Sequence, residues 1–402
     1  MKGHIRRRGK NAWAVKIDHG TDPVTGKRRT KWHSVKGERG KPPTRADAVR
    51  LRTKLLYELQ EGSYVEPAKL TVAELLDKWL ADAANAVRPK THERYAEIVA
   101  THLKPALGQH ALARLQPIHI QEAWSQAQAA GRRDGKGGLS AQTVKHHHRV
   151  LSQALKWAVR LRLLAQNPVE HVDAPRPRRR EMQILSPAEV AQVLAAVDGT
   201  WLHMPILLAV TTGMRRGEIL GLRWRDVDLD AGALSVRQML EQTRGDAAGD
   251  DGRRPSVLRF QEPKTARSRR RLDLPAMTVD ALRGHKARQA ERLLALGHRQ
   301  TGDDLVIARQ DGEPLHPDTL TKEFAGVVAG LDVPRVRFHD LRHTHLSHLL
   351  LNGVHPKVAS ERAGHASVTI TLDTYSHVLP GMQADAAKSI DALLRTAIEQ
   401  NS

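Results

Sequence analysis

The stretch Ala174-Pro175-Arg176-Pro177-Arg178-Arg179-Arg180 is the clearest boundary in this chain of 402 residues. Its prolines stiffen the backbone, and Arg178 and Arg179 are candidates for contact with a phosphate backbone. Shortly after it, Ser186-Pro187-Ala188-Glu189 combines a capping box with a proline at the first helical position. We therefore expect one domain to end near residue 174 and another, over 184–402, to begin with a helix.

The chain is strongly basic, with 64 Lys or Arg, 44 Asp or Glu and a formal net charge of +20. Such a chain attracts polyanions with a salt-dependent affinity, so nucleic acid is the leading partner and a membrane surface the other possibility. No segment approaches about 18 uninterrupted apolar residues, and the start MKGHIRRRGK lacks the apolar core of a signal peptide. Cysteine is absent. We expect a soluble cytoplasmic protein that joins the nucleoid when it is bound to DNA.

Over residues 68–174, just before the boundary, the sequence has the pattern of four helices and no clear strand. Thr71-Val72-Ala73-Glu74 is a capping box that opens a helix through Leu80. Further helical patterns lie at about 90–103, 118–129 and 140–163, and Lys145 in the last of them is a candidate DNA contact. A compact all-α domain over 68–174 is the expected result.

Residues 1–60 hold 17 Lys or Arg against 5 Asp or Glu. Apolar side chains alternate over 13–17, a turn follows at 22–26, and a returning strand is expected over 27–35, before a helix at about 46–59. We predict a folded DNA-binding domain over 1–62, in preference to a disordered basic tail. Its candidate DNA contacts are Arg28, Arg29 and Lys31.

After the boundary, helical patterns mix with short strands near 233–237, 256–261 and 269–274. The predicted fold class is therefore multidomain α+β: a small β-sheet plus helix, an all-α domain, and a mainly α domain with a small antiparallel sheet. The common catalytic signatures GxxxxGK[ST] and HExxH are missing, and no acidic cluster indicates a two-metal site. An enzyme of this kind that acts on DNA has to neutralise phosphate with its own cations.

The first candidate segment is Thr212-Gly213-Met214-Arg215-Arg216-Gly217-Glu218-Ile219, which follows the apolar run 206–210. An arginine between two buried helices is costly unless it serves a phosphate or a carboxylate, and Glu218 is placed to orient Arg215. A buried Arg–Glu pair without chemistry is the alternative, and this segment taken alone favours it.

The second segment is Phe338-His339-Asp340-Leu341-Arg342-His343-Thr344, where the i, i+3 spacing puts His339 and Arg342 on one helix face, able to bind one anion. His339 and His343 also have the i, i+4 spacing of zinc ligands, but no other ligand signature accompanies them, so we expect no metal. The run His146-His147-His148 is interpreted as a solvated or DNA-facing helix surface.

The third segment is Gly364-His365, which Tyr375 follows ten residues later. Only four tyrosines occur in the chain, and this one lies in the polar run 371–378. A lone tyrosine is normally a packing or surface residue, so Tyr375 by itself indicates little.

Together the three segments resemble the tyrosine recombinases, also called the phage-integrase family. The motif order of that family is an Arg in a TGxR-x-x-E segment, a HxxR segment, then GH and a Tyr about ten residues later. A further catalytic lysine of the family lies in a strand turn, which the segment 263–269 resembles, and the match covers about 184–380. The matching positions are Arg215, Lys264, His339, Arg342, His365 and Tyr375.

The resemblance implies a role for each of these residues, with Glu218 in support. Tyr375 attacks phosphorus and forms a 3′-phosphotyrosine with a free 5′-hydroxyl, and Lys264 protonates the leaving 5′-oxygen. The arginines and histidines stabilise the charge that develops on the phosphate. The covalent link conserves the bond energy, so neither a metal nor another cofactor is expected.

The resemblance also implies a site-specific recombinase, an integrase that inserts or excises a mobile element such as a prophage. Residues 1–62, 68–174 and 184–402 then correspond to arm-binding, core-binding and catalytic domains on double-stranded DNA. Four strand exchanges require a homo-tetramer, and a directionality factor or a DNA-bending host protein is a further expected partner. A C-terminal stretch is expected to pack on its own domain or on a neighbour through Ile390, Leu393, Leu394 and Ile398.

Three alternatives remain open at this level: a transposon-type integrase, a relaxing topoisomerase that uses the same tyrosine chemistry, and a non-catalytic DNA-binding regulator on the same fold. The basic N-terminal segment and the compact helical domain favour recombination over relaxation. A regulator has no need of a nucleophile, so the filled catalytic positions disfavour the third alternative.

Overall fold

The computed structural model describes residues 3–10, 12–21, 25–37, 41–60, 69–177, 182–245, 255–262, 269–375 and 382–400. The chain forms two compact units, Met1–Arg179 and Arg180–Ser402.

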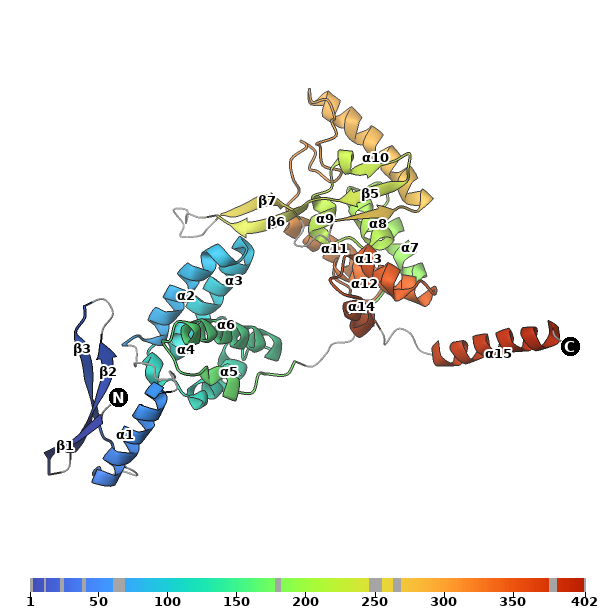
Figure 1. Ribbon diagram of the computed structural model, residues 1–402. Coiled ribbons are helices and arrows are strands. Elements are labelled where there is room, and N and C mark those ends of the chain that lie inside the picture. Colours follow the sequence, from blue (N-terminus) through green and yellow to red (C-terminus); the bar gives the residue numbers. More distant parts are fainter. Residues whose placement is uncertain are drawn as a thin grey trace. The chain divides into compact units, whose positions relative to one another are not determined.

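The first unit begins with a three-stranded antiparallel sheet in the order β1-β2-β3, covered by one helix (Figure 1). The sheet packs on the helix through a small apolar core, because alternate residues of the central strand, Val15 and Ile17, point to one face. The first strand was not predicted, since Ile5 is its one large apolar residue among basic ones. The elements are β1 (Gly3–Gly9), β2 (Ala12–Thr21), β3 (Arg28–Ser34) and α1 (Arg45–Gln60).

The rest of the first unit is helical, as the sequence predicts. The capping box at Thr71 forms: its hydroxyl accepts from the Glu74 amide, and the Glu74 carboxylate accepts from the Thr71 amide. The described elements are α2 (Val72–Ala86), α3 (Pro89–Ile98), a π-turn (Val99–Leu103), α4 (Lys104–Leu107), a 3₁₀ turn (Leu112–Arg114), α5 (Pro117–Ala130), α6 (Ala141–Arg160) and a 3₁₀ turn (Pro168–His171).

The expected helix at 90–103 is divided, because its last five residues form the π-turn. Pro105 lies just beyond this turn and has no amide hydrogen to donate, and its ring crowds the carbonyl four residues earlier. Wider i→i+5 hydrogen bonding just before a proline agrees with that crowding.

The histidine run on α6 does not form the solvated surface expected of it. His146 is exposed, but His147 is buried and stacks on His102, with ring centroids 4.3 Å apart. Consecutive residues of a helix point about 100° apart, so three in a row cannot share one face. Burial lowers the pKa of His147 to about 4, which keeps its ring neutral.

The second unit packs helices around two small sheets, a three-stranded one in the order β4-β5-β8 and the hairpin β6-β7. The hairpin extends away from the helices of this unit (Figure 1). The first strand of the hairpin, β6, follows β5 directly in the chain. It was not predicted as a separate strand. The elements are α7 (Pro187–Ala196), α8 (His203–Thr212), α9 (Arg216–Leu220), a 3₁₀ turn (Trp224–Asp226), β4 (Val227–Asp228), β5 (Ala233–Val236), β6 (Met239–Arg244), β7 (Ser256–Gln261), β8 (Arg270–Asp273), α10 (Ala276–Ala295), α11 (Pro317–Ala329), α12 (Asp340–Leu351), α13 (Pro356–Ala363), α14 (Val368–Tyr375) and α15 (Met382–Gln400).

Helix α8 lies in the core of the second unit, since most of its residues are buried. Helix α12 packs against it, and α13 and α14 follow in the chain. The ends of α8, α13 and α14 carry the residues that the sequence singles out. The core of this unit therefore fixes where those helix ends lie.

Candidate active site

The turn between α8 and α9 places Arg215 and Glu218. Helix α8 ends at Gly213, whose φ of 66° is left-handed, and a Cβ there would lie 2.6 Å from Cδ2 of His345. Only glycine meets both conditions. Arg215 then stands at the N-cap of α9, where its amide donates to Glu218 Oε2 (2.9 Å) and its Nη1 to Glu218 Oε1 (2.8 Å).

Glu218 binds a second arginine that the sequence analysis did not select. Arg270 of β8 donates to Glu218 Oε2 (2.8 Å) and Oε1 (3.2 Å), and its own side chain is 7% exposed. Burial would raise the pKa of Glu218, but the hydrogen bond and charge of Arg270 and the charge of Arg215 lower it to about 2. Glu218 is therefore an ionised carboxylate held between two guanidinium groups.

Arg342 joins two helix ends from α12. Its Nη1 donates to the carbonyl of Gly213 and its Nη2 to the carbonyl of Ala363, both at 2.6 Å. Both carbonyls lie at helix C-termini, where the helix dipole favours a cation. Burial, reinforced by Arg215, lowers the pKa of Arg342 to about 9, so it stays charged at neutral pH. We call Arg215, Glu218, Arg270 and Arg342 the Glu218 cluster.

The end of α13 brings His365 beside the cluster. Gly364 has a φ of 64°, its carbonyl accepts from Nη2 of Arg215 (3.2 Å), and a Cβ on it would lie 3.0 Å from Nη1 of Arg270. His365 makes a hydrogen bond between its Nδ1 and Oγ1 of Thr371 (2.8 Å). Burial first, then the charge of Arg342, lowers the pKa of His365 to about 4.

Tyr375 ends α14 as a buried residue, 1% exposed. Its hydroxyl lies 2.6 Å from Nδ1 of His343, and burial raises the pKa of Tyr375 to about 12 while it lowers that of His343 to about 4. The tyrosine is therefore protonated and shares a hydrogen bond with a neutral histidine. From its spacing, His343 was expected at most to be a zinc ligand. Its position next to Arg342 already indicated that it could lie in the active site.

His339 lies at the N-cap of α12 and is exposed to solvent over part of its surface. Its ring meets that of His343 at right angles, with centroids 5.2 Å apart. Burial of the rest of the ring, then the charge of Arg342, lowers the pKa of His339. The structure thus joins His339 to Tyr375 through His343.

Other candidate residues fall outside the described residues or belong to the first unit. Lys264, Arg178 and Arg179 are outside the described residues. Lys145 is exposed on α6.

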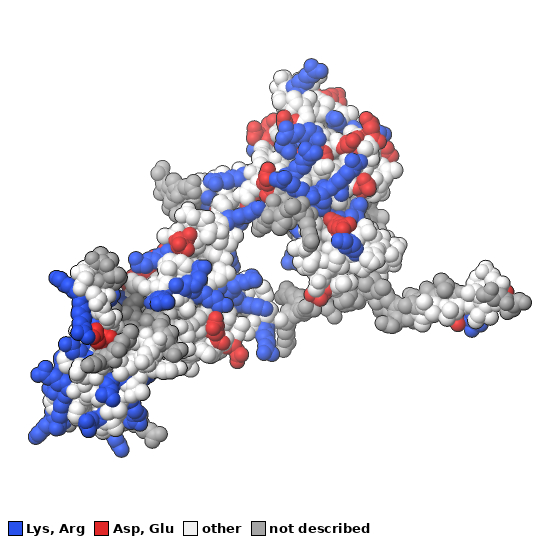
Figure 2. Space-filling view, viewed as in Figure 1, with Lys and Arg blue, Asp and Glu red and all other residues white. Residues whose placement is uncertain are grey.

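In the N-terminal sheet, Arg28 and Arg29 are exposed, Lys31 is half-buried, and Arg28 donates to Asp18 (Nε to Oδ2, 2.8 Å). Arg8 of β1, absent from the predictions, lies over the ring of Trp32 at 4.7 Å. Figure 2 shows Lys and Arg side chains gathered over this sheet and α1.

Within the described parts of the chain, no group of three or more His, Asp or Glu is placed to hold a metal ion. No described helix is long and apolar enough to cross a membrane.

Family models match two parts of the chain. Residues 183–381 match the phage integrase family, and residues 71–127 match the N-terminal SAM-like domain of phage integrases. A "Tyrosine recombinase XerC-like" protein of Caldanaerobacter subterraneus is 27% identical over 87% of this chain and 90% of its own length. The "ICEBs1 integrase" of Bacillus subtilis is 25% identical over 97% of this chain and 100% of its own length.

Solved structures share the fold. The Tn1549 transposon integrase in complex with transposon right end DNA has a TM-score of 0.66 at 21% identity, covering 80% of this chain and 100% of that one. A lambda integrase tetramer bound to a Holliday junction has a TM-score of 0.52 at 20% identity, covering 91% of this chain and 96% of that one. These likenesses confirm the multidomain α+β fold class and the resemblance stated above. The chain belongs to the phage integrase family of tyrosine recombinases, enzymes that transfer DNA strands.

Proposed function

We propose that this recombinase is an integrase that cuts and rejoins DNA at specific sites to insert or excise a mobile element such as a prophage, with Tyr375 as the nucleophile. The observation that carries the proposal is the meeting of Tyr375 with His343, close to three arginines held by helix ends. The first and last of these residues, Arg215 and Tyr375, are more than 150 positions apart in the chain. The carboxylate of Glu218 holds two of the arginines, Arg215 and Arg270.

The arginines stabilise the scissile phosphate. Attack by a side-chain oxygen builds charge on the non-bridging oxygens, and preorganised cations lower the energy of that state. Arg215 is suited to the contact because its side chain stays 35% exposed although Glu218 fixes it. Arg342 uses two of the five N–H donors of a guanidinium on carbonyls, so it fixes the turn and adds positive charge.

Tyr375 has to lose its proton as its oxygen bonds to phosphorus. With a pKa of about 12 it does not ionise at neutral pH without help, and His343 is the acceptor within hydrogen-bonding distance. The bond from phosphorus to the 5′-oxygen breaks as the Tyr375 bond forms. Lys264 then gives its proton to that 5′-oxygen, and reversal of these steps with a new 5′-hydroxyl rejoins the strand. His339 and His365 donate to phosphate oxygens in this scheme.

The three segments take different roles on DNA in this proposal. Residues 184–402 cut, 68–174 grip the core site through Lys145, and 1–62 bind arm sites through Arg28, Arg29 and Lys31. Arg178 and Arg179, in the boundary stretch that follows 68–174, contact the phosphate backbone. The basic sheet supports the arm-binding assignment, since Arg8 and Lys16 both lie over Trp32 and keep cations at its surface. Four copies are proposed to act together, with a directionality factor or a DNA-bending host protein, and α15 exposes Ile390 and Leu394 for contact with a neighbour.

A transposon-type integrase is the second candidate. The observation that favours it is the higher TM-score with the Tn1549 transposon integrase than with lambda integrase. The two candidates share the chemistry at Tyr375 and differ in the element that is moved.

The decisive experiment traps the covalent intermediate on a nicked suicide substrate. Tyr375→Phe should abolish covalent attachment and leave sequence-specific binding nearly unchanged, because only the attacking oxygen is lost. Tyr57→Phe is the control, since Tyr57 is an exposed tyrosine of α1, and should attach like the wild type. Equal covalent complex with Tyr375→Phe would overturn the mechanism.

Deletion of residues 1–60 tests the arm-binding role. The shortened chain should still cleave an isolated core site but should integrate poorly, because it no longer holds the second DNA sequence. Both reactions can be measured on plasmid substrates with and without arm sites. Unchanged integration would contradict this assignment and leave the chemistry at Tyr375 untouched.

A further inference from the structure

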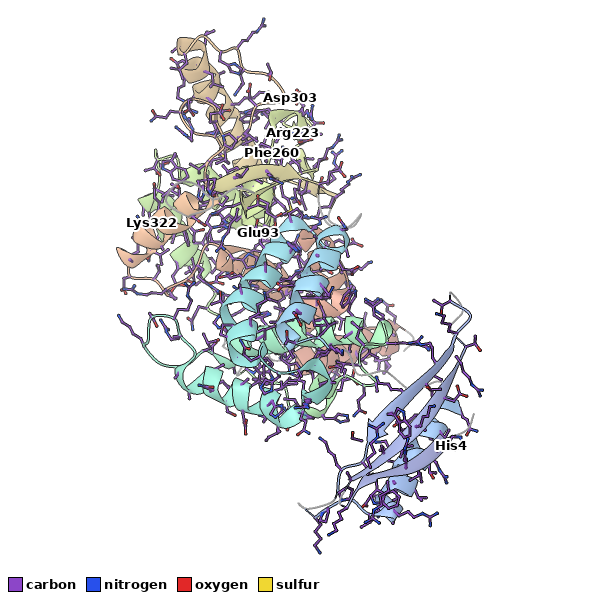
Figure 3. The ribbon with its side chains drawn as sticks, turned by 90° about the vertical axis from the view of Figure 1, so that its left-hand side faces the viewer. His4, Glu93, Arg223, Phe260, Asp303 and Lys322 are labelled. Atoms are coloured by element: carbon purple, nitrogen blue, oxygen red, sulfur yellow. The ribbon has the colours of Figure 1, made fainter. Side chains whose placement is uncertain are left out.

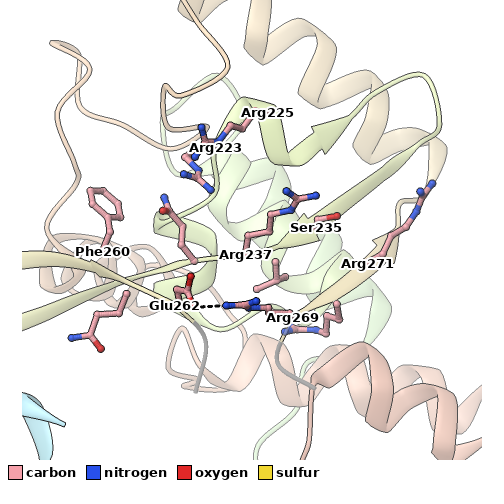
Figure 4. A pocket seen from close by; sticks show the side chains of 12 residues that line it. Arg223, Arg225, Ser235, Arg237, Phe260, Glu262, Arg269 and Arg271 are labelled. Carbon is pink, nitrogen blue, oxygen red and sulfur yellow. Dashed lines mark hydrogen bonds and ion pairs between the residues drawn. The ribbon is translucent and has the colours of Figure 1, made fainter. Parts of the chain in front are cut away.

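A second group of arginines lines a cavity of about 650 Å³ in the second unit (Figure 4). The cavity is bounded by the start of the 3₁₀ turn at Trp224, the end of β5, the end of β7 and the start of β8. Phe260 and Glu262 also line it. Arg270 of the Glu218 cluster lines it too, and we call the other five arginines the arginine pocket: Arg223, Arg225, Arg237, Arg269 and Arg271.

Strand β8 contributes residues both to this pocket and to the Glu218 cluster. The side chain of Arg270 turns inward and binds Glu218, while Arg269 and Arg271 on either side are exposed. Successive residues of a strand point to opposite faces, so one strand supplies an arginine to the cluster and its neighbours to the pocket. A ligand in the pocket would therefore lie next to the Glu218 cluster.

A buried carboxylate holds two of the pocket arginines. Asp226 is 2% exposed at its side chain and holds Nε of Arg223 at 2.9 Å, with Nε of Arg237 at 3.6 Å from its other oxygen. Arg223 is itself largely buried. This arrangement repeats that of Glu218, in which a buried acid fixes arginines whose remaining donors point elsewhere.

Among the described residues, the outer arginines pair with exposed carboxylates. Arg225 pairs with Asp303 at 2.5 Å, Arg271 lies 3.8 Å from Asp273, and Arg269 pairs with Glu262. Each of those carboxylates is more than two-thirds exposed. Exposed ion pairs contribute little free energy, so a phosphate can replace the carboxylate at low cost.

We propose that the arginine pocket binds two successive backbone phosphates of duplex DNA next to, and distinct from, the phosphate that is cut. In Figure 4, Arg223 and Arg225 lie at one end of the pocket and Arg269 at the other, with Arg237 between them. Cations spread in this way suit a polymer with successive phosphates better than one small anion. Phe260, half exposed and close to Arg223 (Figure 3), offers an apolar surface to the deoxyribose between two phosphates.

This inference rests on the proposed action on DNA, and salt-dependent binding tests it. The full-length double variant Arg237→Gln/Arg271→Gln and the wild type bind a fluorescent core-site duplex, and Kd is measured by anisotropy over a series of KCl concentrations. Losing two phosphate contacts should lower the slope of log Kd against log salt by about 1.8 and weaken binding about tenfold. The control is Arg309→Gln/Arg395→Gln, which removes the same charge from two exposed, ion-paired arginines outside the pocket.

The outcomes separate the two proposals. A slope and an affinity that match those of the control variant would overturn the pocket, given that melting temperatures show both variants to be folded. Pocket-dependent binding of inorganic phosphate without any change in DNA binding would also overturn it, since the ligand would then be a free anion. Failure of the wild type to form a covalent complex would overturn the role of Tyr375. The slope of log Kd against log salt would still show whether the arginine pocket binds DNA.

Discussion

The Glu218 cluster and the arginine pocket use the same device in opposite surroundings. In both, a buried carboxylate fixes arginines, Glu218 for Arg215 and Arg270, and Asp226 for Arg223. The cluster sends its other donors to backbone carbonyls at helix ends, whereas the outer pocket arginines meet exposed side chains. Fixed donors suit a reaction that demands geometry, and exchangeable ones suit binding of a chain of phosphates.

The largest expected effect comes from the two buried acids. Glu218→Gln should lower the free energy of unfolding by about 3–5 kcal/mol, because it leaves Arg270 buried without a counter-charge. Asp226→Asn should cost only about 1–2 kcal/mol, since Arg223 is more exposed than Arg270 and Arg237 reaches solvent. Urea unfolding of the full chain measures both. Glu361→Gln, in an exposed pair with Lys357, is the control at below about 0.5 kcal/mol, and equal losses at Glu218 and Asp226 would break the comparison.

The second effect concerns the rate of cutting. Arg342→Lys should slow covalent-complex formation at saturating DNA by about 10²–10³-fold, because an ammonium cannot span the carbonyls of Gly213 and Ala363 as a planar fork does. Arg237→Lys should instead weaken DNA binding by about threefold or less. Single-turnover rates and binding constants, measured separately, tell these apart. A rate for Arg342→Lys close to that of the wild type would remove the distinction between fixed and exchangeable donors.

The smallest of these effects concerns the pH dependence of covalent attachment. His343→Ala should slow covalent attachment by on the order of 10²-fold at pH 7.5, since Tyr375 loses its proton acceptor. Burial holds the pKa of His343 at about 4, below its ordinary value of 6.5, so the histidine stays neutral as pH falls through 6. The rate advantage of the wild type over His343→Ala should therefore persist from pH 8 to 6 and disappear as pH approaches 4.

The pH dependence of the rate advantage also tests whether His343 is held neutral. A rate advantage that disappears around pH 6.5 would mean that His343 titrates like an exposed histidine and is not held as described. His146→Ala, an exposed histidine of α6, should show the wild-type rate throughout.

The catalytic motifs could be recognised from the sequence because Arg215, His339 and Tyr375 stand at helix ends. The caps at Thr71 and Ser186 mark where helices begin, and both form as predicted. Glu218 was predicted to orient Arg215, and it does. The strand β1 and the division of the helix before Pro105 escaped prediction, because neither leaves a regular apolar period.

The sequence alone determined the family, the α+β class and the excess of positive charge, since these follow from spacing and composition. Only the tertiary structure decided which groups meet: Tyr375 finds His343, and Arg270 crosses from β8 to Glu218. The physical reason is that such contacts join residues far apart in the chain, whose distance depends on how helix ends pack. At residues 174–180, composition marks the boundary between two compact units. Packing within the second unit then brings the active-site residues together.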